Sequence, residues 1–428
     1  MTPAFELFVG LCGGGRHRKQ PTGSLPIFRA RTRFPTFLDS WTLSPMRTAQ
    51  RRRLAMGSFF VGVCMLMMLT TQSTDARITR EDIRRAHLAV RERGGTSSPV
   101  ADLRCEADSL PTAPEGAVKF FALGDWGVRG LDVGSEAQLD VARGISCAAR
   151  AIRPRFIVTL GDNFYPKGVT SENDRQFSFK FEEVYRDDAL HVPWFPSLGD
   201  HDHLGDVNAQ SMYSLKSDRW SMPRAWYVEV IPLTNGGKLQ LIFVDWVALE
   251  GRFSVSSNDR RFQKHLGEAA GKDTSEEHWE WLRRVTSSSN PTWRVVIGHR
   301  PLISVSARSA KDDERYPAEG RARSAIREFI EGADVDLWIN GHDHTAQVAC
   351  SERGGGTTHF VTSGIGGYDL HALRPREEWE ETLYAENGYH GFTAHIATDD
   401  TLTTHFMDER GRVRHSVDIR KDSSRCNY

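Results

Sequence analysis

The chain has 428 residues, enough for one large domain or two with an ample hydrophobic core. It carries 55 Lys and Arg against 56 Asp and Glu, so its formal net charge is −1. A nearly neutral chain has no general positive field to attract nucleic acid, so nucleic acid is not an expected partner and any binding must come from a local site.

Residues 46–76 have the pattern of a secretory signal peptide. A basic stretch, Arg51-Arg52-Arg53, is followed by the uncharged run 54–74 and then by small and polar residues up to Ala76. We expect cleavage near Ala76. The run is also long enough for an uncleaved signal anchor, and only that alternative would attach the chain to a membrane. Either outcome places the rest of the chain in the secretory pathway, secreted or lumenal.

The remaining boundaries follow from this segment. Residues 1–45 are rich in Arg and Pro without periodicity, so we expect an unstructured leader, or translation that begins at Met46. Residues 77–115 are expected to be an exposed lead-in, and 116–428 to be the folded domain. Four cysteines remain after cleavage, which allows three complete disulfide pairings: they are Cys105, Cys147, Cys350 and Cys426.

Five apolar runs in the chain are predicted to be buried strands, and each ends in glycine followed by aspartate or histidine. The runs are 118–123, 156–160, 193–198, 293–297 and 335–339, and they end in Gly124-Asp125, Gly161-Asp162, Gly199-Asp200, Gly298-His299 and Asn340-Gly341-His342. A helix predicted over 135–152 connects the first two runs. A strand, a helix and a strand make a parallel crossover, so both aspartates emerge at the same edge of one sheet.

The other predicted elements indicate a mixed α/β protein of at least two layers, since strands and helices alternate before a group of strands ends the chain. Helices are expected around 174–186, 276–285 and 319–331, a strand at 239–244, a long polar connection at 251–275, and further strands at 358–362, 392–397 and 402–406.

Oxygen and nitrogen donors therefore gather where the strands end, because ligands of α/β proteins bind at the carboxyl ends of the strands. Seven donors are too many for one ion and suit two ions that share a carboxylate. Two such ions can clamp the entering and leaving oxygens of an in-line displacement. The expected metal ligands are Asp125, Asp162, Tyr165, Asp200, His299, His342 and His344.

The order of these motifs resembles that of the metallophosphoesterases. Within them, Gly-Asp-Asn-Phe-Tyr at 161–165 and Gly-His-Asp-His at 341–344 are similar to the purple, tartrate-resistant acid phosphatases. The resemblance covers about residues 117–420. Tyr165 is the discriminating position, because the related serine/threonine protein phosphatases do not use a tyrosine ligand. The implied fold is α/β (α+β), with two mixed β-sheets packed as a sandwich and flanked by helices.

The resemblance also implies a function, the hydrolysis of phosphomonoesters by a metal-bound hydroxide at a dinuclear centre. The substrate would be a small molecule or a phosphoprotein. Fe(III) would be held by Asp125, Tyr165 and His344, a second divalent ion (Fe, Zn or Mn) by Asp200, His299 and His342, and Asp162 would bridge the two. His201 would protonate the leaving alcohol, which is favoured at mildly acidic pH.

Two residues depart from the family pattern. Asp200 stands where the family has asparagine, and its added charge would lower the Lewis acidity of the divalent ion and repel a phosphate dianion. On that argument, Asp200→Asn is expected to raise turnover. Arg308 stands where a second active-site histidine is usual, and it can grip phosphate but cannot transfer a proton. The alternative for Arg308 is a solvated loop charge.

Two other functions remain as alternatives to an active acid phosphatase. One is a scaffold that has lost turnover, since the family includes a membrane anchor of the gliding motor. The other is a phosphodiesterase or protein phosphatase, which Tyr165 and the lumenal location disfavour. By position, 251–275 corresponds to a loop that in the resembled family covers the active site until it is cut.

Overall fold

The computed structural model describes residues 113–131, 135–251, 260–315, 317–421 and 426. The chain divides into two units, 1–95 and 96–428, and every described residue belongs to the second. The predicted leader, the predicted signal segment and nearly all of the predicted lead-in therefore lie outside the described residues. Among the helices that the structure describes, none combines the length and the apolar character needed to span a bilayer.

One mixed sheet contains the first three predicted strand ends. Its strand order is β13-β12-β11-β1-β2-β3, with β1, β2 and β3 parallel and the other neighbours antiparallel. The strands are β1 (Val118–Leu123), β2 (Phe156–Leu160), β3 (Trp194–Ser197), β11 (Gly391–Ala397), β12 (Thr401–Asp408) and β13 (Val413–Arg420). Helix α3 (Ser135–Ile152) makes the crossover from β1 to β2, as predicted.

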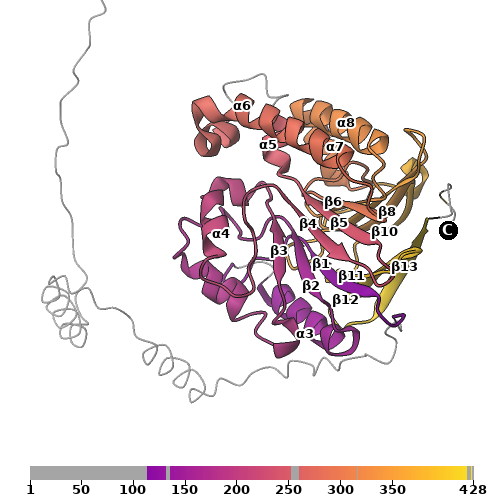
Figure 1. The fold of residues 1–428 in the computed structure, drawn as a ribbon. Coiled ribbons are helices and arrows are strands. Elements are labelled where there is room, and N and C mark those ends of the chain that lie inside the picture. The colour runs from indigo at the N-terminus through magenta and orange to yellow at the C-terminus, as the bar shows by residue number, and fades with distance from the viewer. Residues whose placement is uncertain (1–112, 132–134, 252–259, 316, 422–425, 427–428) are drawn as a thin grey trace, which may run out of the picture. The chain divides into compact units, whose positions relative to one another are not determined.

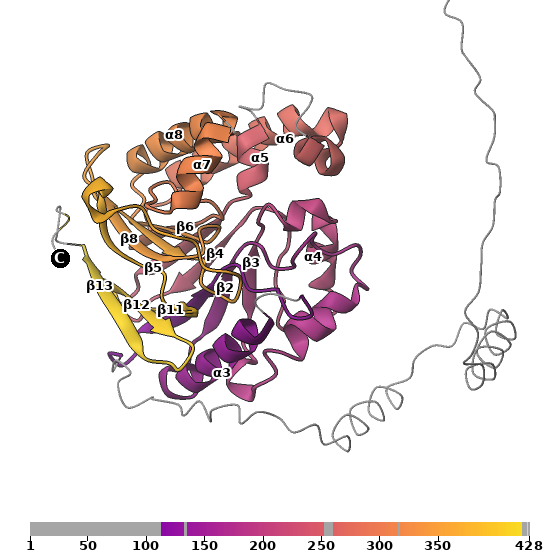
Figure 2. The ribbon, with the colours of Figure 1, turned by 180° about the vertical axis from the view of Figure 1, so that it is seen from behind.

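The second mixed sheet contains the last two strand ends. Its order is β10-β8-β9-β7-β6-β5-β4, with β5, β6, β7 and β9 parallel. The strands are β4 (Tyr227–Pro232), β5 (Lys238–Phe243), β6 (Trp293–Ile297), β7 (Leu337–Asn340), β8 (Ala346–Ser351), β9 (Thr358–Ser363) and β10 (Thr382–Glu386). The sheets face each other, with α3 beside the first sheet and most of the remaining helices on the outer face of the second (Figures 1 and 2).

The alternation of side chains along the strands explains this layering, because successive residues of a strand point to opposite faces. In β5, Leu241 and Phe243 join the large core that contains β1 and β11, whereas Ile242 joins a second core beneath the helices. In β7, Ile339 joins the large core and Trp338 joins the second core. The helices near the second sheet are α5 (Trp246–Glu250), α6 (Arg260–Ser287), α7 (Ala307–Arg315) and α8 (Pro317–Gly332). Helix α4 (Val207–Tyr213) lies near β3 of the first sheet.

The predicted fold class is confirmed, since the described residues form two mixed sheets with flanking helices. The prediction of a loop over the whole of 251–275 is wrong, because α6 already begins at Arg260. Glutamine, lysine, leucine, glutamate and alanine from 263 to 270 are good helix formers, and this outweighs the polar composition on which the loop was predicted. Residues 252–259 of that segment lie outside the described residues.

Several short elements were not predicted: they are β4, β8, β10, β13, α4, α5 and α7. Strand β13 alternates between exposed side chains and side chains that are half-buried or buried, at the edge of its sheet, so it has no continuous apolar run. Among the pairings left open by the sequence, the structure contains the disulfide Cys350–Cys426, and Cys147 is disulfide-bonded as well.

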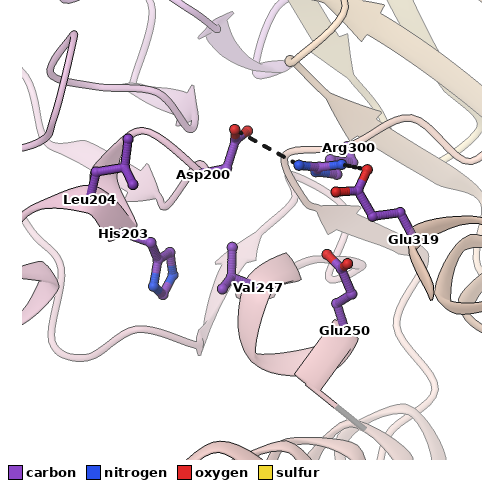
Figure 3. Close-up of a pocket in the computed structure, with 7 residues that line it drawn as sticks. All are labelled: Asp200, His203, Leu204, Val247, Glu250, Arg300 and Glu319. Atoms are coloured by element: carbon purple, nitrogen blue, oxygen red, sulfur yellow. Dashed lines mark hydrogen bonds and ion pairs between the residues drawn. The ribbon is translucent and has the colours of Figure 1, made fainter. Parts of the chain in front are cut away.

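A pocket lies beside the strand ends, between β3, α5 and the start of α8. It is a small cavity that opens to solvent. Its polar lining faces inward from several elements (Figure 3). The side chains around it include Asp200, His203, Val247, Glu250, Arg300 and Glu319.

Candidate metal centre

The centre is built from turns that follow β1, β2, β3, β6 and β7. Three of its side chains come from residues with a left-handed backbone, Asp125 at φ 59°, Asp162 at φ 50° and His342 at φ 65°. Such conformations are costly for residues other than glycine and cluster at functional sites, where the surrounding structure enforces them. The backbone therefore turns sharply at the point where each of these side chains leaves its strand.

Glycines next to these residues allow the strand ends to approach one another. A Cβ atom on Gly199 would lie 2.2 Å from both the backbone nitrogen and the Oδ1 atom of Asp162. A Cβ atom on Gly341 would lie 2.5 Å from Asp125 Oδ2. Both distances are far below van der Waals contact, so a glycine is needed at each of these two positions for the strand ends to pack closely at this edge.

Asp125, Tyr165 and His344 form the first donor group. The Tyr165 hydroxyl donates to Asp125 Oδ1 at 3.0 Å and lies 3.3 Å from His344 Nε2. His344 Nε2 is 3.4 Å from the same Asp125 oxygen. The Tyr165 ring is held between Tyr368 and His201, each with a centroid distance of 4.4 Å. A carboxylate, a phenol and an imidazole thus converge in a buried position.

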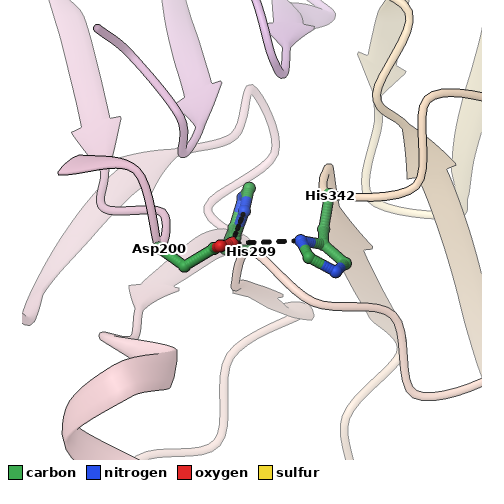
Figure 4. Close-up of side chains that lie close together, drawn as sticks. All are labelled: Asp200, His299 and His342. Atoms are coloured by element: carbon green, nitrogen blue, oxygen red, sulfur yellow. Dashed lines mark hydrogen bonds and ion pairs between the residues drawn. The ribbon is translucent and has the colours of Figure 1, made fainter. Parts of the chain in front are cut away.

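Asp200, His299 and His342 form the second group (Figure 4). Asp200 Oδ1 lies 3.0 Å from His299 Nε2 and 3.1 Å from His342 Nδ1. Asp162 Oδ1 lies 3.4 Å from His299 Nε2. Donor atoms of Asp125, Asp162 and His299 also lie within 4.8 Å of one another. Asp162 and His299 therefore link the two groups.

The imidazole tautomers suit metal binding. His299 Nδ1 hydrogen-bonds to the Leu160 carbonyl at 2.8 Å, and His344 Nδ1 to the Asp369 carbonyl at 2.5 Å. A carbonyl accepts a proton from the ring, so Nε2 of each ring is left with its lone pair toward the centre. His342 presents Nδ1 instead, while its buried Nε2 makes no hydrogen bond and lies 3.8 Å from Asp312 Oδ2.

The charges of the centre call for a cation. Burial alone would lower the pKa of His299, but Asp162, Asp200 and Asp125 outweigh it and raise this pKa to about 10. Burial and then the charges of Asp125 and Asp162 raise the pKa of Tyr165 well above its usual range. A phenolate can form here only opposite a positive charge. Hard oxygen donors and imidazoles are the ligands that iron, zinc and manganese accept, so the residues fit the expected ions.

The two residues predicted to act in catalysis lie in different settings. His201 is half-buried, donates its backbone N–H to Asp162 Oδ1 at 2.8 Å, and hydrogen-bonds through Nδ1 to the Pro166 carbonyl at 2.7 Å. Burial lowers its pKa, but the charges of Asp162 and Asp200 outweigh burial and raise it.

Arg308 belongs to helix α7 and not to a loop. Its side chain is 55% exposed, and Arg308 Nε lies 2.9 Å from Asp312 Oδ2. Because Asp312 also approaches His342, Arg308 lies at the rim of the centre rather than within it.

Sequence reasoning missed several neighbours of the seven donors. The guanidinium of Arg300 lies 3.8 Å from Asp200 Oδ2, and the signal for it was its place directly after His299. The His371 ring stacks on His344 at 4.0 Å and accepts the His344 backbone N–H at 3.1 Å. No motif precedes His371, so nothing in the sequence pointed to it.

Comparison with known proteins agrees with this geometry. Residues 118–346 match the family described as calcineurin-like phosphoesterase. Tartrate-resistant acid phosphatase type 5 of Mus musculus is 31% identical over 296 residues, covering 68% of this chain and 83% of the mouse protein. The Homo sapiens protein of that name is 30% identical over 300 residues, covering 68% and 85%. Purple acid phosphatase 4 of Arabidopsis thaliana is 28% identical over 313 residues, covering 72% and 85%.

Solved structures show the same fold. GAP50, the anchor in the inner membrane complex of Plasmodium, aligns with a TM-score of 0.57 at 23% identity, covering 72% of this chain and 90% of GAP50. Purple acid phosphatase PPD1 from yellow lupin aligns with a TM-score of 0.51 at 17% identity, covering 73% and 55%. A family match over more than half of the chain, together with relatives at 30% identity and above, shows that the chain belongs to the calcineurin-like phosphoesterases, the family that its strand-end motifs predicted.

Proposed function

We propose that this chain is an acid phosphatase that hydrolyses phosphomonoesters at a dinuclear metal centre. Its place among the phosphoric monoester hydrolases follows from its relatives, which are acid phosphatases. The observation that carries the dinuclear centre is the pair of donor groups at one sheet edge, linked by Asp162 and His299.

In this proposal each donor group holds one ion. Asp125, Tyr165 and His344 hold Fe(III), for which a buried phenol oxygen is a suitable hard ligand. Asp200, His299 and His342 hold a divalent ion, iron, zinc or manganese, and Asp162 bridges. The bound ions would polarise the phosphoryl group and supply an activated water at mildly acidic pH.

The chain's own residues would handle the proton of the leaving group. The Pro166 carbonyl fixes His201 Nδ1 as a donor, which leaves Nε2 of the protonated ring free to give its proton to the leaving oxygen. The neighbouring carboxylates favour that protonated form. Arg308 at the rim would contact the part of the substrate beyond the phosphate, provided that it exchanges Asp312 for the substrate.

Purification of the full-length chain, with metal analysis and an assay on p-nitrophenyl phosphate across acidic pH, tests this function. We expect two equivalents of transition metal, a violet colour when oxidised, and a hydrolysis rate that disappears when a chelator removes the metal. Fewer than two equivalents, or two equivalents without turnover, would reject the proposal. The second of these results would favour the alternative of a scaffold without turnover.

We propose further that the chain acts in the secretory pathway. The 46–76 pattern and the Cys350–Cys426 disulfide support this, because disulfides persist in oxidising compartments. An amino-terminal residue near position 77 on the mature protein is the expected result. A mature chain that retains 46–76 would favour the signal anchor instead.

A further inference from the structure

The two carboxylate oxygens of Asp200 lie in different surroundings. Oδ1 faces the ring nitrogens of His299 and His342, at 3.0 and 3.1 Å. Oδ2 faces away from them toward the guanidinium of Arg300, whose Nη2 is 3.8 Å away (Figure 3). One oxygen is therefore available to an ion between the histidines, and the other is engaged by a positive charge.

Arg300 is held firmly in this position. Only 4% of its side chain is exposed, and its Nη1 forms a buried ion pair with Glu319 at the start of α8. Glu250 at the end of α5 adds a second negative charge on the same side (Figure 3). A planar guanidinium gripped by one carboxylate has few ways to reorient, so it presents the same edge to Asp200.

This arrangement matters because a free aspartate can bind a cation through both oxygens, whereas an asparagine binds through its single carbonyl oxygen only. A guanidinium 3.8 Å from Oδ2 disfavours a cation contact at this second oxygen and also offsets part of the charge that Asp200 brings.

We propose that Arg300 is a positioning residue that keeps Asp200 a one-oxygen ligand of the divalent ion, so that this aspartate acts as an asparagine would. The inference rests on the proposed function. It also changes the expectation from the sequence, because Asp200→Asn alone should alter the centre little while Arg300 is present.

A double-mutant cycle tests the inference. Arg300→Met together with Glu319→Gln removes the ion pair without changing the net charge, and Glu319 is not left as a buried carboxylate without its partner. The two substitutions are introduced together into the native chain and into the Asp200→Asn variant. Glu319→Gln alone is the control, since the glutamine oxygen still accepts from Arg300.

The readouts are the binding of inorganic phosphate to the zinc-loaded protein by calorimetry and the number of zinc ligands by X-ray absorption. With Asp200 present, loss of the ion pair is expected to weaken phosphate binding by about tenfold and to add one oxygen ligand, as changes behind a metal ligand commonly have effects of this size. With asparagine at 200, both quantities should stay within about twofold of their starting values.

Equal effects in the two backgrounds, or no effect with Asp200 present, would overturn the inference. If the double variant does not fold, Arg300→Lys serves instead, because a point charge without the planar fork should give an intermediate loss of phosphate binding with Asp200 and none with asparagine. A native chain that binds fewer than two metal equivalents would refute the proposed function itself. If the native chain binds two equivalents and the mutant cycle fails, only the inference about Arg300 is refuted.

Discussion

Replacing His395 with glutamine is expected to make the protein less sensitive to acid. His395 lies in β11, fully buried, with its ring stacked on Phe120 at 4.6 Å. Its two ring nitrogens each lie 2.9 Å from a threonine hydroxyl, that of Thr393 and that of Thr404. Burial, and to a smaller extent His405, lower the pKa of His395 to about 3.

The sign follows from proton linkage. An unfolded histidine titrates near pH 6.5, so between about 6.5 and 3 the unfolded chain binds a proton at this position that the folded chain does not. Stability therefore falls as the pH falls through that window. At 1.36 kcal/mol per pH unit, lowering the pH from 6.5 to 5.0 costs about 2 kcal/mol at this one residue.

Urea unfolding at pH 7.5 and pH 5.0 measures the effect. The drop in unfolding free energy between the two pH values should be about 2 kcal/mol smaller in His395→Gln than in the native protein, whatever the absolute stability of the variant. The other titrating groups cancel in this comparison. Replacing the exposed His191 with glutamine is the control and should leave the drop unchanged. The same drop in the native protein and in His395→Gln would refute the reasoning.

The remaining predictions concern the catalytic edge and the core behind it. His201→Ala should slow esters with poor leaving groups about tenfold more than aryl phosphates, because only the former need a proton from an acid; a uniform loss would contradict that role. Tyr165→Phe should abolish the visible absorption of the oxidised protein, whereas Tyr368→Phe, which alters the ring stacked on it, should retain the colour. A colourless Tyr368→Phe would show that the ligand has been misassigned. Trp126→Ala should cost about 3–5 kcal/mol of unfolding free energy, since this fully buried ring packs among aromatic neighbours and donates to Asn163 Oδ1 at 3.1 Å. A loss below about 1 kcal/mol in denaturant unfolding would contradict that packing argument.

Local patterns were sufficient for the elements with strong periodicity. The helix at 135–152 and the strands at 118–123, 156–160 and 293–297 were predicted with the bounds that the structure has. These segments are either continuous apolar runs or amphipathic repeats, so the order of adjacent residues is enough to predict which side chains are buried. Strand β13 and helix α7 have no continuous apolar run: β13 alternates apolar and polar residues over eight positions, and α7 is short and rich in charged residues, so the search for apolar runs missed both.

By itself, the sequence determined which side chains end the strands, because a Gly-Asp or Gly-His pair after an apolar run is a local feature. Parallel pairing then sends those ends to one edge of a sheet. Only the tertiary structure decided which other side chains contact these strand-end residues. Arg300, in the turn after β6, meets Glu319 of α8, and the two oxygens of Asp200 are distinguished by groups about 100 and 140 positions away in the chain. Such contacts depend on how the two sheets and their helices pack together, and no spacing along the chain encodes them.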